Sequence, residues 1–330
     1  MARLKNYGIA ALAAAAALAI FWVSREDLRL PWQRLRPYER LHAGCAAGFV
    51  SQDYAALKLP GAYTVFYLAW GDKFPSEELK RAGGRRLLTL TWEPYLKSAP
   101  ARSLLGEIAA GRHDAYMRAM AASIKAYGGP VLLRWGHEPN GDWYPWSGAA
   151  NINRPGVYAA AWRRMAGIVR SGAPKARLVF SVSSEDRPGA AWNRFERYYP
   201  GDAYVDAVGI DVYNWGDTQP WSSWKRPNML LKEPYSRALD MAPSKPLLLT
   251  EVASCSSGGS RAEWLRRLFW RLKSRYTAIK GFMWFDYEKE CDWRLSADPE
   301  AAAVYAAQLR DDGYFTSDPA SLDWLFTEKI

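Results

Sequence analysis

Short apolar runs alternate with helical patterns along most of this 330-residue chain. A short apolar run between helices is typical of a parallel strand that is buried on both faces. Eight such runs predict an α/β fold, a (β/α)8 TIM barrel over residues 43–312, which is a sufficient length for this architecture. The predicted strands span residues 43–50, 63–69, 86–91, 131–136, 178–182, 205–210, 247–250 and 279–285, and predicted helices span 103–127, 155–171, 260–274 and 299–310.

Polar and aromatic side chains gather where these predicted strands end. In a (β/α)8 barrel the carboxyl ends of the strands share one face, and that face carries the active site. Residues far apart in the chain are therefore expected to lie close together there. The residues at the strand ends are Trp92, Glu93, His137, Glu138, Asp211, Tyr213, Glu251, Trp284 and Asp286.

The stretch from Val131 to Trp146 is the most informative of these ends. It begins as an apolar strand and then brings Arg134, His137 and Glu138 together with several aromatic residues. Aromatic faces stack on the apolar faces of sugar rings, and carboxyl groups act on glycosidic bonds. The pattern therefore indicates a sugar-binding site.

This stretch resembles the Arg-Trp-His-Glu-x-Asn-Gly-x-Trp-x-Pro-Trp signature of glycoside hydrolase family 26, the β-mannanase family. The family belongs to a clan of retaining (β/α)8-barrel glycosidases, and the resemblance implies that Glu138 is the general acid/base. Residues 247–254 resemble the nucleophile segment of the same family, which implies that Glu251 is the nucleophile. A salt bridge at the barrel rim is the structural alternative for Glu251.

The resemblance extends to residues expected to bind substrate. His137 is expected to contact the sugar or to position Glu251, and Trp143 to contact the sugar. Tyr213 matches a tyrosine whose hydroxyl keeps the nucleophile ionised, since a donor to a carboxylate favours its charged form. Trp284 is expected to stack under the sugar at the scissile bond, with core packing as its alternative.

Further positions are expected at the edges of the site. Trp92 and Glu93 are candidates for a distal subsite. Asp292 and Arg294 lie in the loop after the last predicted strand, and the sequence of this loop also resembles that of the family. The two residues are expected either to contact sugar or to brace each other.

The three cysteines predict a disulfide but no metal site. Cys255 and Cys291 follow two adjacent predicted strands, so we expect them to be bonded at the same face, with Cys45 left over. The sequence has no Cys-x-x-Cys pair and its three histidines are scattered, so no metal and no cofactor is predicted.

The sequence of the N-terminus predicts that the protein is exported from the cytoplasm. Residues 7–23 are apolar and uncharged and follow Arg3 and Lys5, so residues 1–24 are interpreted as a signal peptide or a signal anchor in the inner membrane. Residues 25–42 are interpreted as a linker and 313–330 as a tail without assigned structure. The catalytic domain is then expected in the periplasm or outside the cell.

The predicted function is that of a retaining endo-β-glycanase acting by double displacement. Its substrate would be a β-linked polysaccharide: a β-1,4-mannan, a mixed-linkage glucan or an exopolysaccharide. The net charge of +10 fits an acidic glycan, an anionic membrane or an ordinary basic surface. No nucleic-acid motif is present, and a monomer is expected. The alternative function is a non-catalytic polysaccharide-binding protein of an export system.

Overall fold

The computed structural model describes residues 42–51, 54, 58–82, 86–152 and 154–327. These residues belong to the compact unit formed by residues 36–330. The predicted signal or anchor segment and residues 25–41 of the predicted linker lie outside the described residues. Within the described part of the chain, no helix is both long enough and apolar enough to cross a membrane.

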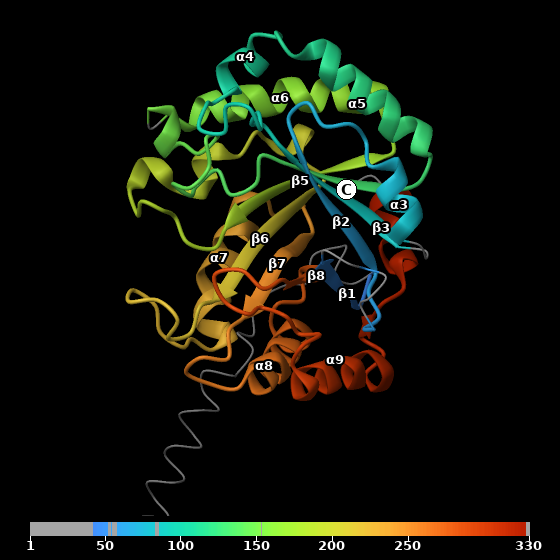
Figure 1. The fold of residues 1–330 in the computed structure, drawn as a ribbon, viewed down its shortest axis with the longest axis vertical. Coiled ribbons are helices and arrows are strands. Elements are labelled where there is room, and N and C mark those ends of the chain that lie inside the picture. Colours follow the sequence, from blue (N-terminus) through green and yellow to red (C-terminus); the bar gives the residue numbers. More distant parts are fainter. Residues whose placement is uncertain (1–41, 52–53, 55–57, 83–85, 153, 328–330) are drawn as a thin grey trace, which may run out of the picture. The chain divides into compact units, whose positions relative to one another are not determined.

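Eight parallel strands, β1 to β8, follow one another around a barrel, with β1 beside β8 (Figure 1). This arrangement confirms the predicted (β/α)8 fold. A short strand, β9 (Phe315–Thr316), pairs with the start of β1 and belongs to the predicted tail. The eight strands are β1 (Cys45–Ser51), β2 (Tyr63–Ala69), β3 (Leu87–Glu93), β4 (Val131–Trp135), β5 (Ala176–Ser183), β6 (Ala207–Asn214), β7 (Leu247–Ser254) and β8 (Ile279–Asp286).

The barrel closes where β1 approaches β2. The backbone N–H of Ala62 donates to the carbonyl oxygen of Ala47 at 2.9 Å. A Cβ atom on Gly48 would lie 2.7 Å from the ring of Tyr63 and 3.0 Å from the backbone nitrogen of Ala62. Closure at this point therefore requires a glycine at position 48, because any side chain would push the two strands apart.

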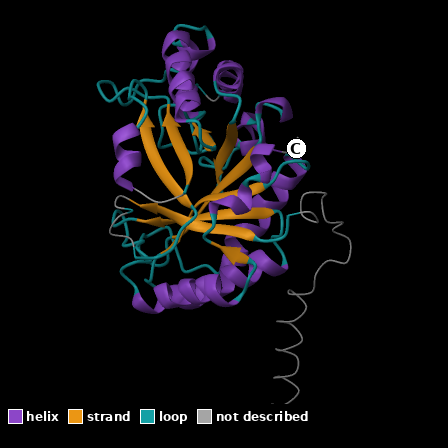
Figure 2. Ribbon diagram, turned by 90° about the vertical axis from the view of Figure 1, so that its right-hand side faces the viewer, coloured by secondary structure: helices purple, strands orange, loops and turns teal. Residues whose placement is uncertain are grey.

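Helices surround the strands (Figure 2). The single helix predicted over 103–127 is wrong, because Gly111 has a φ of +82° and the helix is interrupted there. Helix α7 was not among the predicted helices. The helices are α3 (Ser76–Ala82), α4 (Leu105–Ala109), α5 (Asp114–Tyr127), α6 (Pro155–Gly172), α7 (Pro227–Met241), α8 (Arg261–Ser274), α9 (Pro299–Asp311) and α10 (Trp324–Thr327), with 3-10 turns at Ala149–Asn151, Ala191–Asn193, Phe195–Tyr198, Asp202–Tyr204 and Pro319–Leu322.

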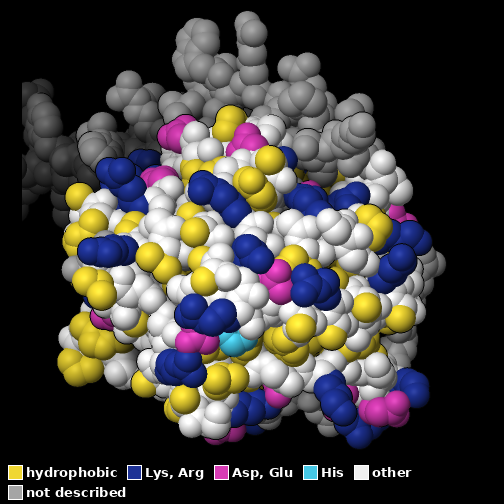
Figure 3. All heavy atoms as spheres, turned by 90° about the horizontal axis from the view of Figure 1, so that it is seen from above, with side chains coloured by type: hydrophobic (Ala, Val, Ile, Leu, Met, Phe, Trp, Pro, Cys, Tyr) yellow, Lys and Arg dark blue, Asp and Glu magenta, His cyan; other side chains and the backbone are white. Residues whose placement is uncertain are grey.

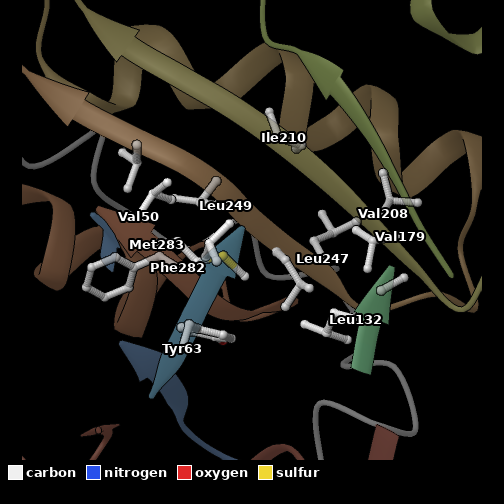
Figure 4. Close-up of a cluster of buried hydrophobic side chains, with 14 of the residues drawn as sticks. Val50, Tyr63, Leu132, Val179, Val208, Ile210, Leu247, Leu249, Phe282 and Met283 are labelled. Atoms are coloured by element: carbon white, nitrogen blue, oxygen red, sulfur yellow. The ribbon is translucent and has the colours of Figure 1, made fainter. Parts of the chain in front are cut away.

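Apolar side chains from the strands fill the barrel interior. Figure 4 shows Val50, Leu132, Val208, Leu249 and Met283, which come from five different strands and converge on one cluster. Burial of each such side chain contributes about 1.5–3 kcal/mol, so this layer holds the strand ends above it in place.

Strands β6 and β7 continue further than the sequence predicted. They were expected to end at residues 210 and 250, but they reach Asn214 and Ser254. A register shift follows Ile210, which pairs with Leu249, so that Asp211 pairs with Glu251. Two carboxyl groups are thereby placed side by side on rigid strands rather than on loops.

Basic side chains do not form a continuous surface on the face shown in Figure 3. Lys and Arg side chains lie there in separate groups, with acidic and apolar side chains between them. For this face, the net charge fits an ordinary solvated surface.

Cys255 and Cys291 form a disulfide in the structure, with their Cα atoms 6.3 Å apart. Cys255 directly follows β7, and Cys291 lies in the loop after β8. Cys45 is free and buried in β1. The disulfide therefore ties together two loops at the carboxyl face of the barrel.

We expect the denatured, unreduced protein to contain one reactive thiol, that of Cys45. The disulfide links residues 36 positions apart, and a crosslink of this span restricts the unfolded chain, so reduction should lower the free energy of unfolding by about 2–4 kcal/mol. Thiol titration and denaturant unfolding measure the two quantities. The Cys45→Ala variant should show no thiol before reduction, and reduction should lower its free energy of unfolding by the same amount. Three thiols before reduction would contradict the pairing.

Candidate active site

A cleft of about 860 Å³ opens at the carboxyl ends of the strands. Its lining combines carboxyl groups with aromatic rings, the composition expected of a site that binds sugars. The residues that lie nearest the predicted chemistry are Tyr67, Glu93, Glu138, Trp143, Tyr213, Glu251 and Trp293.

Glu251 is held by three donors from three different strands. The hydroxyl of Tyr67 donates to Oε1 at 2.6 Å, and Nη1 of Arg134 donates to the same oxygen at 2.7 Å. The hydroxyl of Tyr213 donates to Oε2. Glu251 itself is 6% exposed. Hydrogen bonds and an adjacent positive charge favour the ionised carboxylate, so Glu251 is arranged to carry a negative charge.

Arg134 connects Glu251 to a second carboxylate, that of Asp211. Its guanidinium group is almost fully buried and forms ion pairs with both residues. Asp211 also accepts hydrogen bonds from Thr250 and Ser181. A buried charge is tolerated only when it is paired and hydrogen-bonded, and this network meets that condition.

Sequence reasoning gave no role to Arg134 or Tyr67. A charged residue inside the apolar run of β4 was the available signal for Arg134. Tyr67 lies in an apolar strand that contains two other aromatic residues, and nothing in the sequence distinguishes it from them.

Glu138 lies three residues after the end of β4 in a strained backbone conformation, with a φ of +50°. Nε1 of Trp143 donates to its Oε2 at 2.9 Å. Burial raises the pKa of Glu138 well above its usual range, and the negative charges of Asp211 and Glu251 raise it further. Burial therefore favours the protonated form of Glu138, which is the form that a general acid requires.

Glu93 is a further carboxyl group on the wall of the cleft, where a residue of a distal subsite was expected. Burial raises its pKa to about 7, although the charge of Arg134 opposes this shift. Near neutral pH the Glu93 side chain can therefore donate as well as accept a hydrogen bond.

His137 does not position Glu251. Its Nε2 lies 2.9 Å from the hydroxyl of Tyr144, and the ring is buried behind that tyrosine rather than in the cleft lining. Burial, together with the charge of Arg134, holds the pKa of His137 well below its usual range. The imidazole is neutral and orients Tyr144, which does line the cleft.

The predicted cleft positions of Trp284 and Trp92 are wrong, because both side chains are fully buried behind the barrel wall. Successive side chains on a strand point to opposite faces. Phe285 and Glu93 face the cleft, so their neighbours Trp284 and Trp92 face the helices. Trp284 packs against Trp264 of α8, and Trp92 against Tyr116 of α5.

The loop after β8 supplies a different tryptophan to the cleft. Trp293 lines it and packs edge-on against Tyr213, with ring centroids 5.1 Å apart. Asp292 and Arg294 brace each other, through contacts of 2.8 and 2.9 Å, and neither is part of the cleft lining. Of the two alternatives for this pair, the structure has the mutual ion pair.

Trp143 and Tyr213 lie where sugar contacts and nucleophile support were expected. Trp143 is 47% exposed on the cleft wall beside Glu138, and Tyr213 contacts Glu251. Among the described residues, no group of three or more His, Cys, Asp or Glu side chains is placed to hold a metal ion.

Glu93→Gln should stabilise the protein at alkaline pH but not at acidic pH. Glu93 has an ordinary pKa of 4.5 when unfolded and about 7 when folded. The folded state therefore binds the proton more tightly, and wild-type stability should fall as pH rises from about 4.5 to 7. Thermal unfolding at pH 4 and pH 8 measures the effect. Glu77→Gln, on the exposed surface of α3, is the control; an equal change for Glu93→Gln at both pH values would contradict this assignment.

A family model described as glycosyl hydrolase family 26 matches residues 112–238, a segment that includes Glu138 and Tyr213. Endoglucanase H of Acetivibrio thermocellus is 36% identical over 223 residues, which cover 66% of this chain and 24% of that protein. Mannan endo-1,4-β-mannosidase A and B of Caldalkalibacillus mannanilyticus is 27% identical over 202 residues, covering 58% of this chain and 35% of that protein. The chain thus spans about a quarter to a third of the length of these two relatives.

The fold is shared with solved structures of the same family. A double mutant of the Cellulomonas fimi endo-β-1,4-mannanase aligns with a TM-score of 0.60 at 18% identity, over 92% of this chain and 78% of that one. The matched segment, the two relatives and the common barrel agree with the resemblance carried by the Arg134–Trp146 stretch. The chain is therefore similar to glycoside hydrolase family 26 in sequence over residues 112–238, and it shares its fold with a solved mannanase structure.

Proposed function

We propose that this protein is an endo-acting β-glycanase that hydrolyses a β-linked polysaccharide with retention of anomeric configuration. The observation that carries the proposal is the contrast between two carboxyl groups in one cleft. Glu251 accepts hydrogen bonds from Tyr67, Arg134 and Tyr213, whereas burial favours the protonated form of Glu138. Retaining glycosidases need one carboxylate nucleophile and one protonated carboxyl group.

The proposed reaction has two displacements. Glu251 attacks the anomeric carbon while Glu138 gives its proton to the departing sugar oxygen, which leaves a glycosyl-enzyme ester. Glu138, now ionised, then takes a proton from water, and the resulting nucleophile displaces Glu251 from the sugar. The second displacement releases Glu251 as a carboxylate, which again accepts hydrogen bonds from Tyr67, Tyr213 and Arg134. The donors that orient Glu251 for attack therefore also favour its departure.

The substrate proposal rests on the relatives and on the cleft. One relative is named an endoglucanase and another a mannan endo-1,4-β-mannosidase, so mixed-linkage glucan and β-1,4-mannan are the first candidates. An exopolysaccharide remains in the proposal because the sequence of residues 1–24 favours export. The disulfide between Cys255 and Cys291 supports a location outside the cytoplasm, since such bonds persist in oxidising compartments.

Glu251→Ala should abolish hydrolysis, and Glu138→Ala should lower it by about 10²–10⁴-fold on polysaccharide. Glu138→Ala should lose much less on an aryl glycoside, because a nitrophenolate departs without a proton. Reducing-end release from mannan, glucomannan, mixed-linkage glucan, xylan and exopolysaccharide measures the first effect. Proton NMR of the first product should show the β-anomer.

The same panel separates the two functional classes. Near-normal activity of Glu251→Ala would reject Glu251 as the nucleophile. Binding to a glycan without turnover by the wild-type protein would instead support the non-catalytic binding protein.

Trp143→Phe should move the alkaline limb of the kcat/KM profile to higher pH. The indole N–H of Trp143 stabilises the charged form of Glu138, so its removal should raise the pKa of that acid further. The general acid then stays protonated, and the enzyme active, at more alkaline pH. Trp221→Phe is a suitable control, because the Trp221 ring contacts Trp215 rather than Glu138. A shift to lower pH would be incompatible with this role.

A further inference from the structure

A continuous row of aromatic rings leads away from Glu251 along the wall of the cleft. Tyr213, which donates to Glu251, packs against Trp293 with ring centroids 5.1 Å apart. Trp293 packs against Trp215 at 5.0 Å, and Trp215 against Trp221 at 5.4 Å. All four rings line the cleft. The row therefore extends from the reacting centre to its last member, Trp221.

The inner rings of this row, Tyr213, Trp293 and Trp215, are buried or half-buried, whereas Trp221 is exposed. Trp293 is fully buried, but Trp221 is 60% exposed. Large aromatic side chains contribute most free energy when they are buried. An indole that is exposed in a cleft is therefore a candidate to be covered by a bound ligand. Among the exposed large apolar side chains of the described residues, Trp143 and Trp221 are the members that line the cleft.

Trp221 is also held by a cation. The guanidinium carbon of Arg187 lies over its ring, 5.7 Å from the centroid. Glu185 pairs with Arg187 at 2.7 Å and with Lys225 at 3.4 Å. Glu185 offsets part of the charge of Arg187, and the guanidinium group carries several N–H donors that suit sugar hydroxyls.

The backbone places this pair on the side of the general acid. The N–H of Arg187 donates to the carbonyl oxygen of Asn140 at 2.8 Å, and Asn140 lies in the loop that carries Glu138 and Trp143. A general acid lies beside the leaving-group oxygen in glycoside hydrolysis. A sugar that reached Trp221 past Glu138 would therefore belong to the leaving half of the chain.

We propose that Trp221 and Arg187 form an outer subsite that stacks and hydrogen-bonds a neutral pyranose of the leaving-group half of the glycan. The inference rests on the proposed glycanase function and adds a subsite to it. The subsite gives the enzyme a preference for long chains, because short substrates do not reach Trp221. It contributes nothing to substrates whose leaving group is a small phenol.

The chain contains a matched control for this surface. Trp270 on α8 is 48% exposed and has the guanidinium of Arg271 over its ring, 4.6 Å from the centroid, but it is not part of the cleft lining. Trp270→Ala therefore removes the same kind of exposed, cation-covered indole from outside the site.

The experiment compares wild type, Trp221→Ala, Trp221→Phe and Trp270→Ala on β-linked gluco- and manno-oligosaccharides from di- to hexasaccharide, and on nitrophenyl glycosides of the same sugars. Trp221→Ala should lower kcat/KM on the longest oligosaccharide about tenfold, which corresponds to roughly 1.4 kcal/mol of lost stacking. It should leave the nitrophenyl substrates unchanged. Trp221→Phe keeps an aromatic face and should recover most of the loss, and Trp270→Ala should match wild type throughout.

Each outcome decides the assignment. Equal losses on long and nitrophenyl substrates, or no loss on either, would overturn the subsite. A loss confined to nitrophenyl substrates would place Trp221 in the other half of the cleft and would also overturn it. If the wild type hydrolyses nothing, the glycanase proposal fails by itself, and calorimetric binding of the hexasaccharides then tests the subsite. Weaker binding by Trp221→Ala than by Trp270→Ala would support a sugar platform, and equal binding would reject it.

Discussion

The buried guanidinium of Arg134 is the interaction on which the rest of the site depends. It lies in β4 with 1% of its surface exposed and forms ion pairs with Asp211 and Glu251. A charge removed from water costs several kcal/mol unless its partners compensate. The barrel provides these partners from β6 and β7, and the pairing of Asp211 with Glu251 brings both carboxyl groups within reach of one cation. Loss of Arg134 would leave two buried carboxyl groups unpaired.

The same cation accounts for the difference between the carboxyl groups of the cleft. The Glu251 carboxylate accepts hydrogen bonds from Arg134 and from two tyrosine hydroxyls, so its negative charge is compensated. Glu138 and Glu93 lie in the same buried region, and for both of them burial outweighs the attraction of Arg134, so their pKa values are raised. The pocket therefore combines a carboxylate held by three donors with a carboxyl group whose protonated form burial favours, and the proposed reaction needs both.

The aromatic residues show that a position at a strand end does not by itself predict which way a side chain points. A residue at a strand end points into the cleft or away from it according to its register, and the register is set by pairing with neighbouring strands. Trp92 and Trp284 were expected in the cleft on the strength of their positions, but each has a neighbour, Glu93 or Phe285, that occupies the inner face. Trp293 and Trp221 come from loops, where no periodicity indicates direction.

The sequence by itself determined the barrel, the order of its strands, and the carboxyl groups that meet at one face. Apolar runs of this length must be buried as parallel strands, and parallel strands bring their carboxyl ends together. It also indicated Glu138, Glu251 and Tyr213 through the family resemblance. Only the tertiary structure decided which groups hold them. Tyr67 and Arg134 contact Glu251 across 184 and 117 residues of chain, and such contacts depend on strand register and barrel closure, which no local pattern encodes.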